Sequence, residues 1–317
     1  MKEYVVFRTK KHKKKRWGKK YIDRRDWPKY NEQLVKRGEF LLDLEWIRNW
    51  KNELDTMNMN KRGRPFEFPD SLIKLQAVWH AMNMPFRMIE GITRMLYEMA
   101  KLPDFNDYTT INRRINRLDF KMEIPEGKNI ALWCDGSGFQ AIGGGGEYLR
   151  DKYGKKHRQW IQVIIFGDSR TKEPVSVEVN LYQCSESESA ERQLGNLIGQ
   201  GADIRKFGGD GGLDDISLWQ LLEDHGIKSF IKPTLRANVK GPCKTRNRSA
   251  RIRIKKGYKL WADRHGYGKR WPATEGIFSA MKRVFGEQLS AKRELGLIQE
   301  AKSIVWAYRK MKKFGEA

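Results

Sequence analysis

The 317-residue chain is poor in the side chains that form disulfides and bind soft metals, with three cysteines and five histidines. Cys134, Cys184 and Cys243 lie far apart and form no CxxC pair. This spacing indicates neither a disulfide framework nor a zinc finger, and it favours a reducing cytoplasm. The histidines form no HExxH motif, so we do not expect catalysis by a transition metal.

Long apolar runs are also missing. No stretch is apolar enough to span a bilayer, no basic amphipathic helix dominates, and the charged N-terminus lacks the apolar segment of a secretory signal. We therefore expect neither a membrane partner nor a signal peptide. The four glycines at 143–146 are not followed by a Gly-Lys-Ser or Gly-Lys-Thr triplet, which excludes a phosphate-binding P-loop. They are expected to form a flexible hairpin tip.

Acidic residues are scarce relative to basic ones. Lys and Arg number 63 against 39 Asp and Glu, which gives a formal net charge of +24. Basic side chains gain free energy by displacing condensed counterions from phosphates, so nucleic acid is the expected partner. Eleven Trp, fourteen Phe and eleven Tyr indicate a folded protein. The length allows one large domain or two ordinary ones.

The basic residues are densest near the N-terminus. Residues 1–20 hold ten lysines and arginines against one acid, Glu3. We expect residues 1–26 to be a basic arm that holds nucleic acid non-specifically or only solvates the terminus. The arm also resembles a nuclear-import signal, but nothing else in the sequence supports a eukaryotic host.

The next region, 27–124, has apolar residues at helical spacing. The segment 60–65 interrupts this pattern with Gly and Pro. A helix capped by Asp70 or Ser71 is expected to follow, then one that starts at Pro85, then one from Asp107 to Leu118.

The last of these helices exposes Arg113, Arg114 and Arg117 and also carries asparagines. Arg and Asn can pair bidentately with guanine and adenine edges. A short helix, a break and such a helix are typical of helix-turn-helix DNA-binding regions. The alternative is an ordinary helical bundle whose last helix is solvated.

From 128 to 317 the pattern changes to that of an α/β domain. Three strands with short links predict an antiparallel meander, and a strand, a helix and a strand follow. This order implies a mixed sheet with flanking helices. The strands are expected at 129–139, 159–166, 175–181, 204–210 and 228–232, and helices at 185–198, 216–222 and 295–311.

The segment 236–270 holds thirteen basic residues and one acid, Asp263. Tyr258, Trp261 and Tyr267 are interleaved with them. We interpret the segment as an insertion that grips nucleic acid, with the aromatic rings available for stacking on bases. The alternative is a solvated loop.

A further helix is expected to begin at Pro272, because proline suits a first helical position. Its buried stripe would consist of Ile277, Phe278, Met281, Val284 and Phe285. Glu275 and Lys282 are seven residues apart and project from nearly the same face, beside that stripe. Taken alone, such a pair is usually solvated.

Two aspartates at expected strand ends, Asp135 and Asp210, join Glu275 as candidate catalytic residues. Carboxylates without His or Cys select hard cations such as Mg²⁺ or Mn²⁺. Two such ions can activate a water or a 3′-hydroxyl and stabilise the leaving oxygen of a phosphodiester. Asp214 is an alternative to Asp210 but is better placed to cap the next helix. Asp168 is most simply a turn residue.

The order and spacing of these motifs resemble those of prokaryotic insertion-sequence transposases of the DDE type, which have a ribonuclease-H-like catalytic domain. The segments that match are 133–139 around the first acid, 208–215 around the second and 275–286 around the third. The segments 27–39 and 107–114 also look like that family's leader. The resemblance thus covers nearly the whole chain.

The resemblance implies an enzyme that binds the terminal inverted repeats of its insertion sequence, cuts at their 3′ ends and joins them to target DNA. Asp135, Asp210 and Glu275 would be the catalytic residues and would hold Mg²⁺ or Mn²⁺, as two ions. The DNA-binding residues would be Arg113, Arg114, Arg117, Arg270, Lys282 and Arg283. A homodimer or larger synaptic assembly is implied, because two ends must be held at once. The expected location is the prokaryotic nucleoid.

One departure from the family pattern concerns the helix that carries the third acid. The family commonly has Tyr, two residues, Arg, three residues, Glu, six residues and Lys. Here Tyr267 and Arg270 keep their spacing, but four residues separate Arg270 from Glu275. The assignment of Glu275 and Lys282 stands, and the roles of Tyr267 and Arg270 are open. The first acid is also followed by Gly-Ser-Gly where Ser-Thr-Gly is more usual.

Two other functions fit the same residues. A metal-dependent nuclease of this fold would cut DNA without joining it. An inactive or domesticated copy would bind DNA without cutting, although the presence of all three carboxylates argues against this.

Overall fold

The computed structural model describes residues 25–99, 101–125, 129–142, 159–182 and 184–317. The basic stretch 1–20 and the glycines expected at a hairpin tip lie outside these ranges. Within them, no helix has both the length and the apolar character needed to cross a membrane.

The N-terminal region is helical, as the spacing of its apolar residues predicts. Asp107 caps α5 as expected, and its side chain accepts hydrogen bonds from the backbone amides of Thr109 and Thr110. The expected side-chain cap at Asp70 or Ser71 is wrong, because Pro69 precedes the helix and Asp70 is already inside it. The elements are α1 (Trp27–Glu39), η1 (Phe40–Leu42), η2 (Glu45–Asn49), α2 (Trp50–Asn58), α3 (Asp70–Ala81), α4 (Phe86–Glu98) and α5 (Tyr108–Ile115).

The sheet follows, in the order β3-β2-β1-β4-β5. The first three strands form the expected antiparallel meander, and β4 and β5 add to β1 in parallel. This mixed sheet with flanking helices, preceded by a helical region, confirms the predicted α/β class and its mixed sheet. The strands are β1 (Ile130–Ala141), β2 (Gln159–Asp168), β3 (Pro174–Asn180), β4 (Ile204–Gly209), β5 (Lys228–Ile231) and the short β6 (Gln288–Leu289), which pairs with the end of β1.

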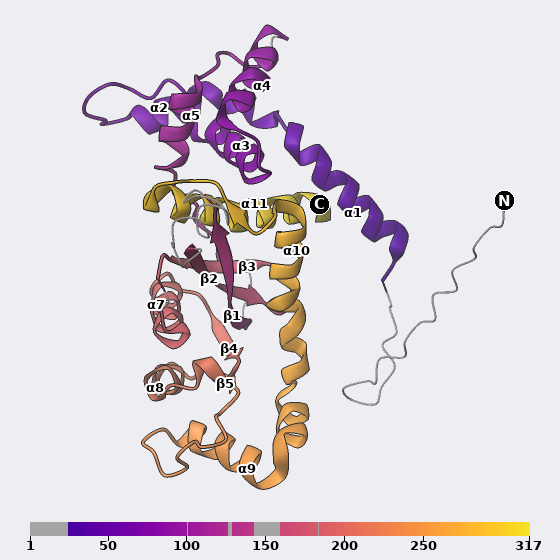
Figure 1. The fold of residues 1–317 in the computed structure, drawn as a ribbon, viewed down its shortest axis with the longest axis vertical. Coiled ribbons are helices and arrows are strands. Elements are labelled where there is room, and N and C mark those ends of the chain that lie inside the picture. The colour runs from indigo at the N-terminus through magenta and orange to yellow at the C-terminus, as the bar shows by residue number, and fades with distance from the viewer. Residues whose placement is uncertain (1–24, 100, 126–128, 143–158, 183) are drawn as a thin grey trace, which may run out of the picture.

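Alternate side chains of β2 enter two different cores, because successive residues of a strand point to opposite faces. Ile164 and Phe166 pack with α7 (Glu186–Gly199) and α8 (Ile216–Asp224). Val163 and Ile165 pack on the other face with α10 (Glu275–Phe285) and α11 (Glu294–Glu316). Figure 1 shows α7 and α8 on one side of the strands and α10 on the other. The sheet is thus held rigidly between two layers.

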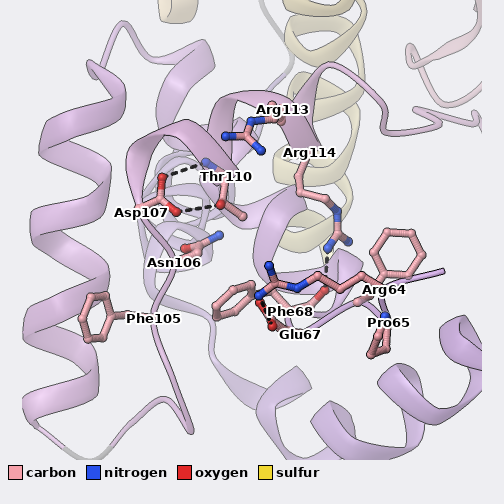
Figure 2. A pocket seen from close by; sticks show the side chains of 11 residues that line it. Arg64, Pro65, Glu67, Phe68, Phe105, Asn106, Asp107, Thr110, Arg113 and Arg114 are labelled. Atoms are coloured by element: carbon pink, nitrogen blue, oxygen red, sulfur yellow. Dashed lines mark hydrogen bonds and ion pairs between the residues drawn. The ribbon is translucent and has the colours of Figure 1, made fainter.

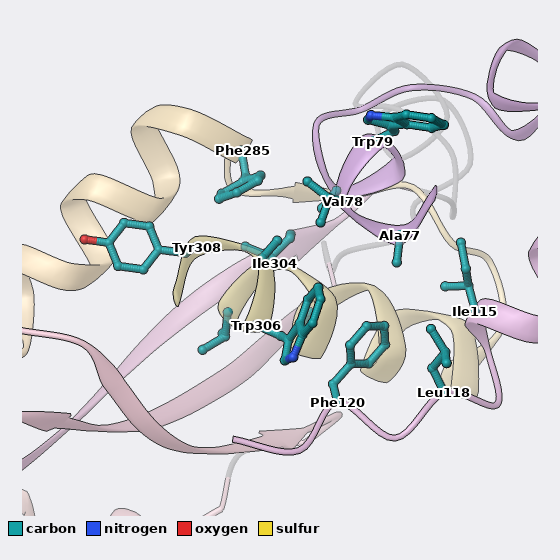
Figure 3. Close-up of a cluster of buried hydrophobic side chains, with 14 of the residues drawn as sticks. Ala77, Val78, Trp79, Ile115, Leu118, Phe120, Phe285, Ile304, Trp306 and Tyr308 are labelled. Atoms are coloured by element: carbon teal, nitrogen blue, oxygen red, sulfur yellow. The ribbon is translucent and has the colours of Figure 1, made fainter. Parts of the chain in front are cut away.

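The helix α11 joins the N-terminal helices to the sheet. Ala77 and Val78 of α3 and Ile304 of α11 belong to one continuous core (Figure 3). This core also includes Val163 and Ile165 of the sheet. The ring centroids of Phe120 and Trp306 lie 5.8 Å apart in this core. The N-terminal helices therefore share their core with the catalytic domain predicted at 128–317.

The basic segment 236–270 is largely helical. Its main element is α9 (Lys244–His265), interrupted at Gly257, which has φ of 81°. Trp261 and Tyr267 are buried in a small core with Trp133. The expectation that these two rings are available for stacking on bases is therefore wrong, because they hold α9 against the sheet.

The start of the next helix also differs from the prediction. Pro272 lies in a 3₁₀ helix, η4 (Tyr267–Ala273), and α10 begins only at Glu275. Four of the five residues expected in its buried stripe are buried, but Val284 is exposed. The irregular backbone of Thr274 separates η4 from α10.

Candidate active site

Two parallel strands bring Asp135 and Asp210 to the same edge of the sheet. The last paired residues of β1 and β4 are Trp133 and Gly208, and each aspartate follows two residues later. Because parallel neighbours end at the same edge, the two carboxylates come close although 75 residues separate them. Asp210 follows β4 as predicted. Asp135 does not end β1, which continues to Ala141 along β2.

A third carboxylate at this edge belongs to Glu186, the first residue of α7. A methyl group placed on Gly136, beside Asp135, would lie 2.5 Å from Glu186 Oε1. One placed on Gly212 would lie 3.1 Å from Asp210 Oδ1 and 3.2 Å from Glu186 Oε2. Glu186 therefore reaches the vicinity of both aspartates. Sequence reasoning missed it, because it is one of three glutamates on a polar helix.

Glu275 approaches from the other side and is paired with Arg270. Arg270 Nη2 lies 2.5 Å from Glu275 Oε1, and Nη1 lies 3.9 Å from Asp135 Oδ1. The guanidinium also lies 5.4 Å from the ring centroid of Tyr267. The irregular turn between η4 and α10 thus brings Arg270 to Glu275 despite the extra residue between them. Arg270, expected to contact DNA, is instead held among the acids.

Two carboxylates at this edge, those of Asp135 and Glu186, have a raised pKa. Burial raises the pKa of Asp135 to about 6, Arg270 opposes this shift, and the charges of Glu186, Glu275 and Asp210 reinforce it. The pKa of Glu186 is also raised, by burial first and then by Asp210, while Arg270 lowers it. Negative charge is therefore in excess over the single arginine at this edge.

The donor set at this edge fits a hard divalent cation. All the candidate ligands are carboxylate oxygens, which Mg²⁺ and Mn²⁺ prefer. Gly136 and Gly212 leave open the space that side chains would fill between the acids. In the present arrangement, no three His, Cys, Asp or Glu side chains of the described ranges lie close enough together to hold a metal ion. Among these acids, Glu275 has Arg270 as its partner.

Lys282 lies next to the same strand. Its ammonium donates to the backbone carbonyl of Gly138 at 2.8 Å and lies 3.1 Å from Glu287 Oε2. Arg283 is exposed and donates to the Ser279 hydroxyl at 3.2 Å. Lys282 is thus fixed on β1, three residues beyond Asp135, and Arg283 is open to solvent.

The two other aspartates considered from the sequence are structural. Asp214 does not cap α8; Asp215 does, by accepting from the Ser217 amide. The carboxylate of Asp214 is fully buried and pairs with Arg246 at 2.8 Å. Asp168 ends β2 and accepts from the Thr171 amide in a turn, as predicted.

The arginines of α5 and the turn after it fall into two groups. The helix ends at Ile115, before the expected Leu118, so Arg117 lies in that turn; Arg113 and Arg117 are exposed. The side chain of Arg114 is only 13% exposed, pairs with Asp70 at 2.7 Å and donates to the Phe68 carbonyl. Arg114 therefore fastens α5 to the start of α3.

A cavity of about 490 Å³ lies between α5 and the segment that precedes α3. Arg64 and Glu67 lie on one of its walls and Arg113 on another, with the Asp107 cap and Phe105 nearby (Figure 2). Arg64 comes from the segment 60–65, predicted only as a break between helices. The segment 60–65 thus adds the exposed Arg64 to the surface around Arg113.

Comparisons with known proteins identify a family and a similar solved structure. A family model described as a transposase DDE domain matches residues 126–308, and a second model with the same description matches residues 35–144. A solved structure of a piggyBac transposase synaptic complex with hairpin DNA is similar at 12% sequence identity and a TM-score of 0.35. That match covers 90% of this chain and 78% of the other.

Proposed function

The chain belongs to the DDE transposase family, and we propose that it binds the terminal inverted repeats of its own insertion sequence, cuts DNA at their 3′ ends and joins those ends to target DNA. The observation that supports the proposal is that Arg270 pairs with Glu275 and lies near Asp135, while the charges of Glu275 and Asp210 both act on Asp135. The family model that matches residues 126–308 contains all three.

In this proposal, Asp135, Asp210 and Glu275 hold Mg²⁺ or Mn²⁺, as two ions. Bound divalent cations supply activation of the attacking oxygen and stabilise the charge on the leaving oxygen. The strands β1 and β4 fix the first two carboxylates, and α10 presents the third. Water attacks the phosphodiester and the bond to the 3′-oxygen breaks, which leaves a free 3′-hydroxyl on the element end. That hydroxyl then attacks a target phosphodiester: its oxygen bonds to the phosphorus, the bond to the target strand's 3′-oxygen breaks, and that oxygen leaves as a 3′-hydroxyl.

The DNA-binding surface of the proposal follows the exposed cations. Arg113 of α5 and Arg117 of the turn after it take part in recognising the element ends, and Arg114 positions the helix through Asp70. Lys282 and Arg283 lie next to the strand that carries Asp135 and contact DNA near the cut. The outer side of α9 adds exposed basic side chains: Lys244, Arg248, Arg251, Lys255, Lys256 and Lys259. Two element ends must be held at once, so we propose a homodimer or a larger synaptic assembly.

The test uses DNA that carries the sequences flanking this gene, incubated with the protein and Mg²⁺ or Mn²⁺. We expect metal-dependent nicks at a repeated end sequence, followed by joined products. The variant Asp210→Asn should lower the cutting rate by on the order of 10³-fold, the size of effect seen when a preorganised charge-stabilising group is lost. Its DNA affinity should stay within about twofold, since phosphate contacts by lysine and arginine carry most of that affinity.

The matched control is Asp224→Asn, the same change at an exposed position at the end of α8. It should cut at the wild-type rate. Nicks without joined products would replace the transposase by a nuclease of the same fold. DNA binding without any nick would identify an inactive copy.

A further inference from the structure

The segment 60–65, between α2 and α3, forms a loop that carries three basic side chains: Lys61, Arg62 and Arg64. The side chain of Arg64 is 82% exposed, and it pairs at 2.6 Å with Glu67, which is itself 53% exposed. Arg62 is also exposed, and it forms no hydrogen bond or ion pair with any residue of the described ranges. An exposed ion pair contributes little to stability, so folding alone does not account for these arginines.

The loop is held in a fixed shape at its base. The Asn58 side chain accepts a hydrogen bond from the Phe66 amide at 2.6 Å and donates one to the Phe66 carbonyl at 2.9 Å. The Lys61 ammonium donates to the Arg64 carbonyl. Gly63 has φ of 85°, a left-handed conformation that glycine adopts without strain, and it turns the chain between the two arginines. A partner that binds the arginines therefore does not have to order the backbone that carries them.

The loop and α5 face the same space. Arg64 lies on one side of the cavity of about 490 Å³ and Arg113 of α5 lies on another (Figure 2). Arg114 joins the two elements, because it donates to the Phe68 carbonyl and its guanidinium lies 4.5 Å from the ring centroid of Phe66. A duplex that contacts α5 through Arg113 therefore also meets the loop.

A loop of this composition fits the minor groove of DNA. The major groove is about 12 Å wide and admits a helix, whereas the minor groove is only about 6 Å wide. Proteins that place a helix in one groove can reach the adjacent minor groove with arginines on an irregular segment. Runs of A·T pairs narrow the minor groove and strengthen its negative potential, which attracts arginine. A side chain built on Gly63 would meet nothing within 4 Å, so the surface between Arg62 and Arg64 is open to an approaching groove.

From this arrangement we infer that the segment 60–65 inserts Arg62 and Arg64 into the minor groove of A·T-rich DNA, beside the DNA contact of α5. The inference rests on the proposed function, because DNA is the partner in both. It adds a second recognition element and states which base pairs that element prefers. A G·C pair places the amino group of guanine in the minor groove, and A·T pairs present only acceptors there. Arginine, which only donates, therefore favours A·T pairs.

The test measures the binding of the full-length protein, by fluorescence anisotropy in EDTA, to duplexes that differ only in a central tract of A·T, G·C or inosine·C pairs. Inosine lacks the amino group of guanine, so an inosine·C pair resembles A·T in the minor groove and G·C in the major groove. The wild type should bind the A·T and inosine·C duplexes alike. It should bind the G·C duplex about tenfold more weakly, a loss within the range that one wrong base pair causes. The salt concentration is the same throughout, because phosphate contacts weaken as salt rises.

The variant Arg62→Ala/Arg64→Ala should bind the three duplexes with equal affinity. The matched control is Arg48→Ala/Lys51→Ala, which removes two positive charges from exposed positions in η2 and α2. The control should keep the tenfold difference between duplexes. Because all four side chains are exposed, both variants should melt at the wild-type temperature, which shows that they are folded.

The outcomes separate this inference from the proposed function. If Arg62→Ala/Arg64→Ala binds all three duplexes more weakly but keeps the preference, the loop contacts only phosphates; the inference is wrong and the proposed function stands. A wild type that prefers A·T but not inosine·C reads the major groove, which also overturns the inference. A wild type that binds no duplex overturns it together with the DNA binding of the proposed function. Loss of the preference in the alanine variant, with a control that keeps it, confirms the inference.

Discussion

Asp210 and Asp214 lie four residues apart after the same strand, and their environments are opposite. Asp214 is fully buried and accepts hydrogen bonds from the Trp219 indole, the Thr234 amide and the Arg246 guanidinium. Asp210 is only partly buried, accepts from the Gly212 amide and faces Glu186 and Asp135. The Asp214 carboxylate is surrounded by hydrogen-bond donors, and the Asp210 carboxylate lies near other acids.

The difference shows how this molecule uses the same side chain for two purposes. A buried carboxylate with donors on both oxygens stabilises the loop that holds it, and it has no capacity left for a ligand. A carboxylate placed among like charges costs stability and retains free oxygens. The loop after β4 therefore combines a structural acid and a candidate catalytic acid, and the bonds of Asp214 hold the loop that carries Asp210.

The comparison is tested first where we expect the largest change in stability. Asp214→Ala leaves the Arg246 side chain, which is 9% exposed, without its partner. Removing one member of a buried ion pair costs about 3–5 kcal/mol, so the free energy of unfolding should fall by that amount. Urea denaturation followed by tryptophan fluorescence measures it.

The matched variant for Asp214→Ala is Asp210→Asn, which should change the free energy of unfolding by no more than about 0.5 kcal/mol. The double variant Asp214→Ala/Arg246→Met should lose less than the sum of the two single changes, because the pair is removed together. Equal losses in Asp210→Asn and Asp214→Ala would contradict the comparison.

The sequence alone identifies the candidate catalytic acids more readily than the structural acid Asp214. Asp135 and Asp210 were located because alternating apolar residues define β1 and β4, and an acid after such a strand is conspicuous. The partner of Asp214 is Arg246, 32 residues later and on α9, and no local pattern reports it. Glu186 lies among Glu188 and Glu191 in the sequence, and only the folded chain brings its charge near those of Asp135 and Asp210.

The basic regions show the same limit of sequence-based prediction, because the sequence does not tell exposed basic residues from buried ones. Arg113 and Arg114 are adjacent, and the sequence predicted the same role for both. Arg114 follows the buried Ile111 by three residues, which turns it toward the inside of the helix pair, while Arg113 remains outside. In α9, Tyr258 and Trp261 have the three-residue spacing of one helix face, a signal for packing that the density of basic residues obscured.

A smaller loss of stability is expected where a carboxylate has donors but lies at the surface. Asp107 accepts from two amides and two hydroxyls at the start of α5, and these bonds lower its pKa. Asp107→Ala should lower the free energy of unfolding by about 1 kcal/mol, the usual cost of losing an N-cap. Urea denaturation measures it, and Asp107→Asn should restore most of the loss, since asparagine also caps well. A loss as large as that of Asp214→Ala would mean that the burial of a carboxylate does not determine how much free energy of unfolding its removal costs.

The smallest effect is expected at Glu123, where donors are present but solvent screens them. Its carboxylate pairs with Lys310 at 2.5 Å and Lys313 at 2.6 Å, and it is 54% exposed. The two lysines lower its pKa from 4.5 to about 2. A carboxylate whose pKa is lowered by folding stabilises the fold at pH values above its unfolded-state pKa, and this stabilisation is lost as the pH falls.

At neutral pH, Glu123→Gln should therefore lower the free energy of unfolding by less than about 1 kcal/mol. The difference between variant and wild type should shrink between pH 4.5 and about 2 and in 1 M salt. Urea denaturation across that pH range, with Glu316→Gln as a control for the pair on Lys312, measures it. A difference that persists at pH 2 would show that Glu123 acts through packing and not through its charge.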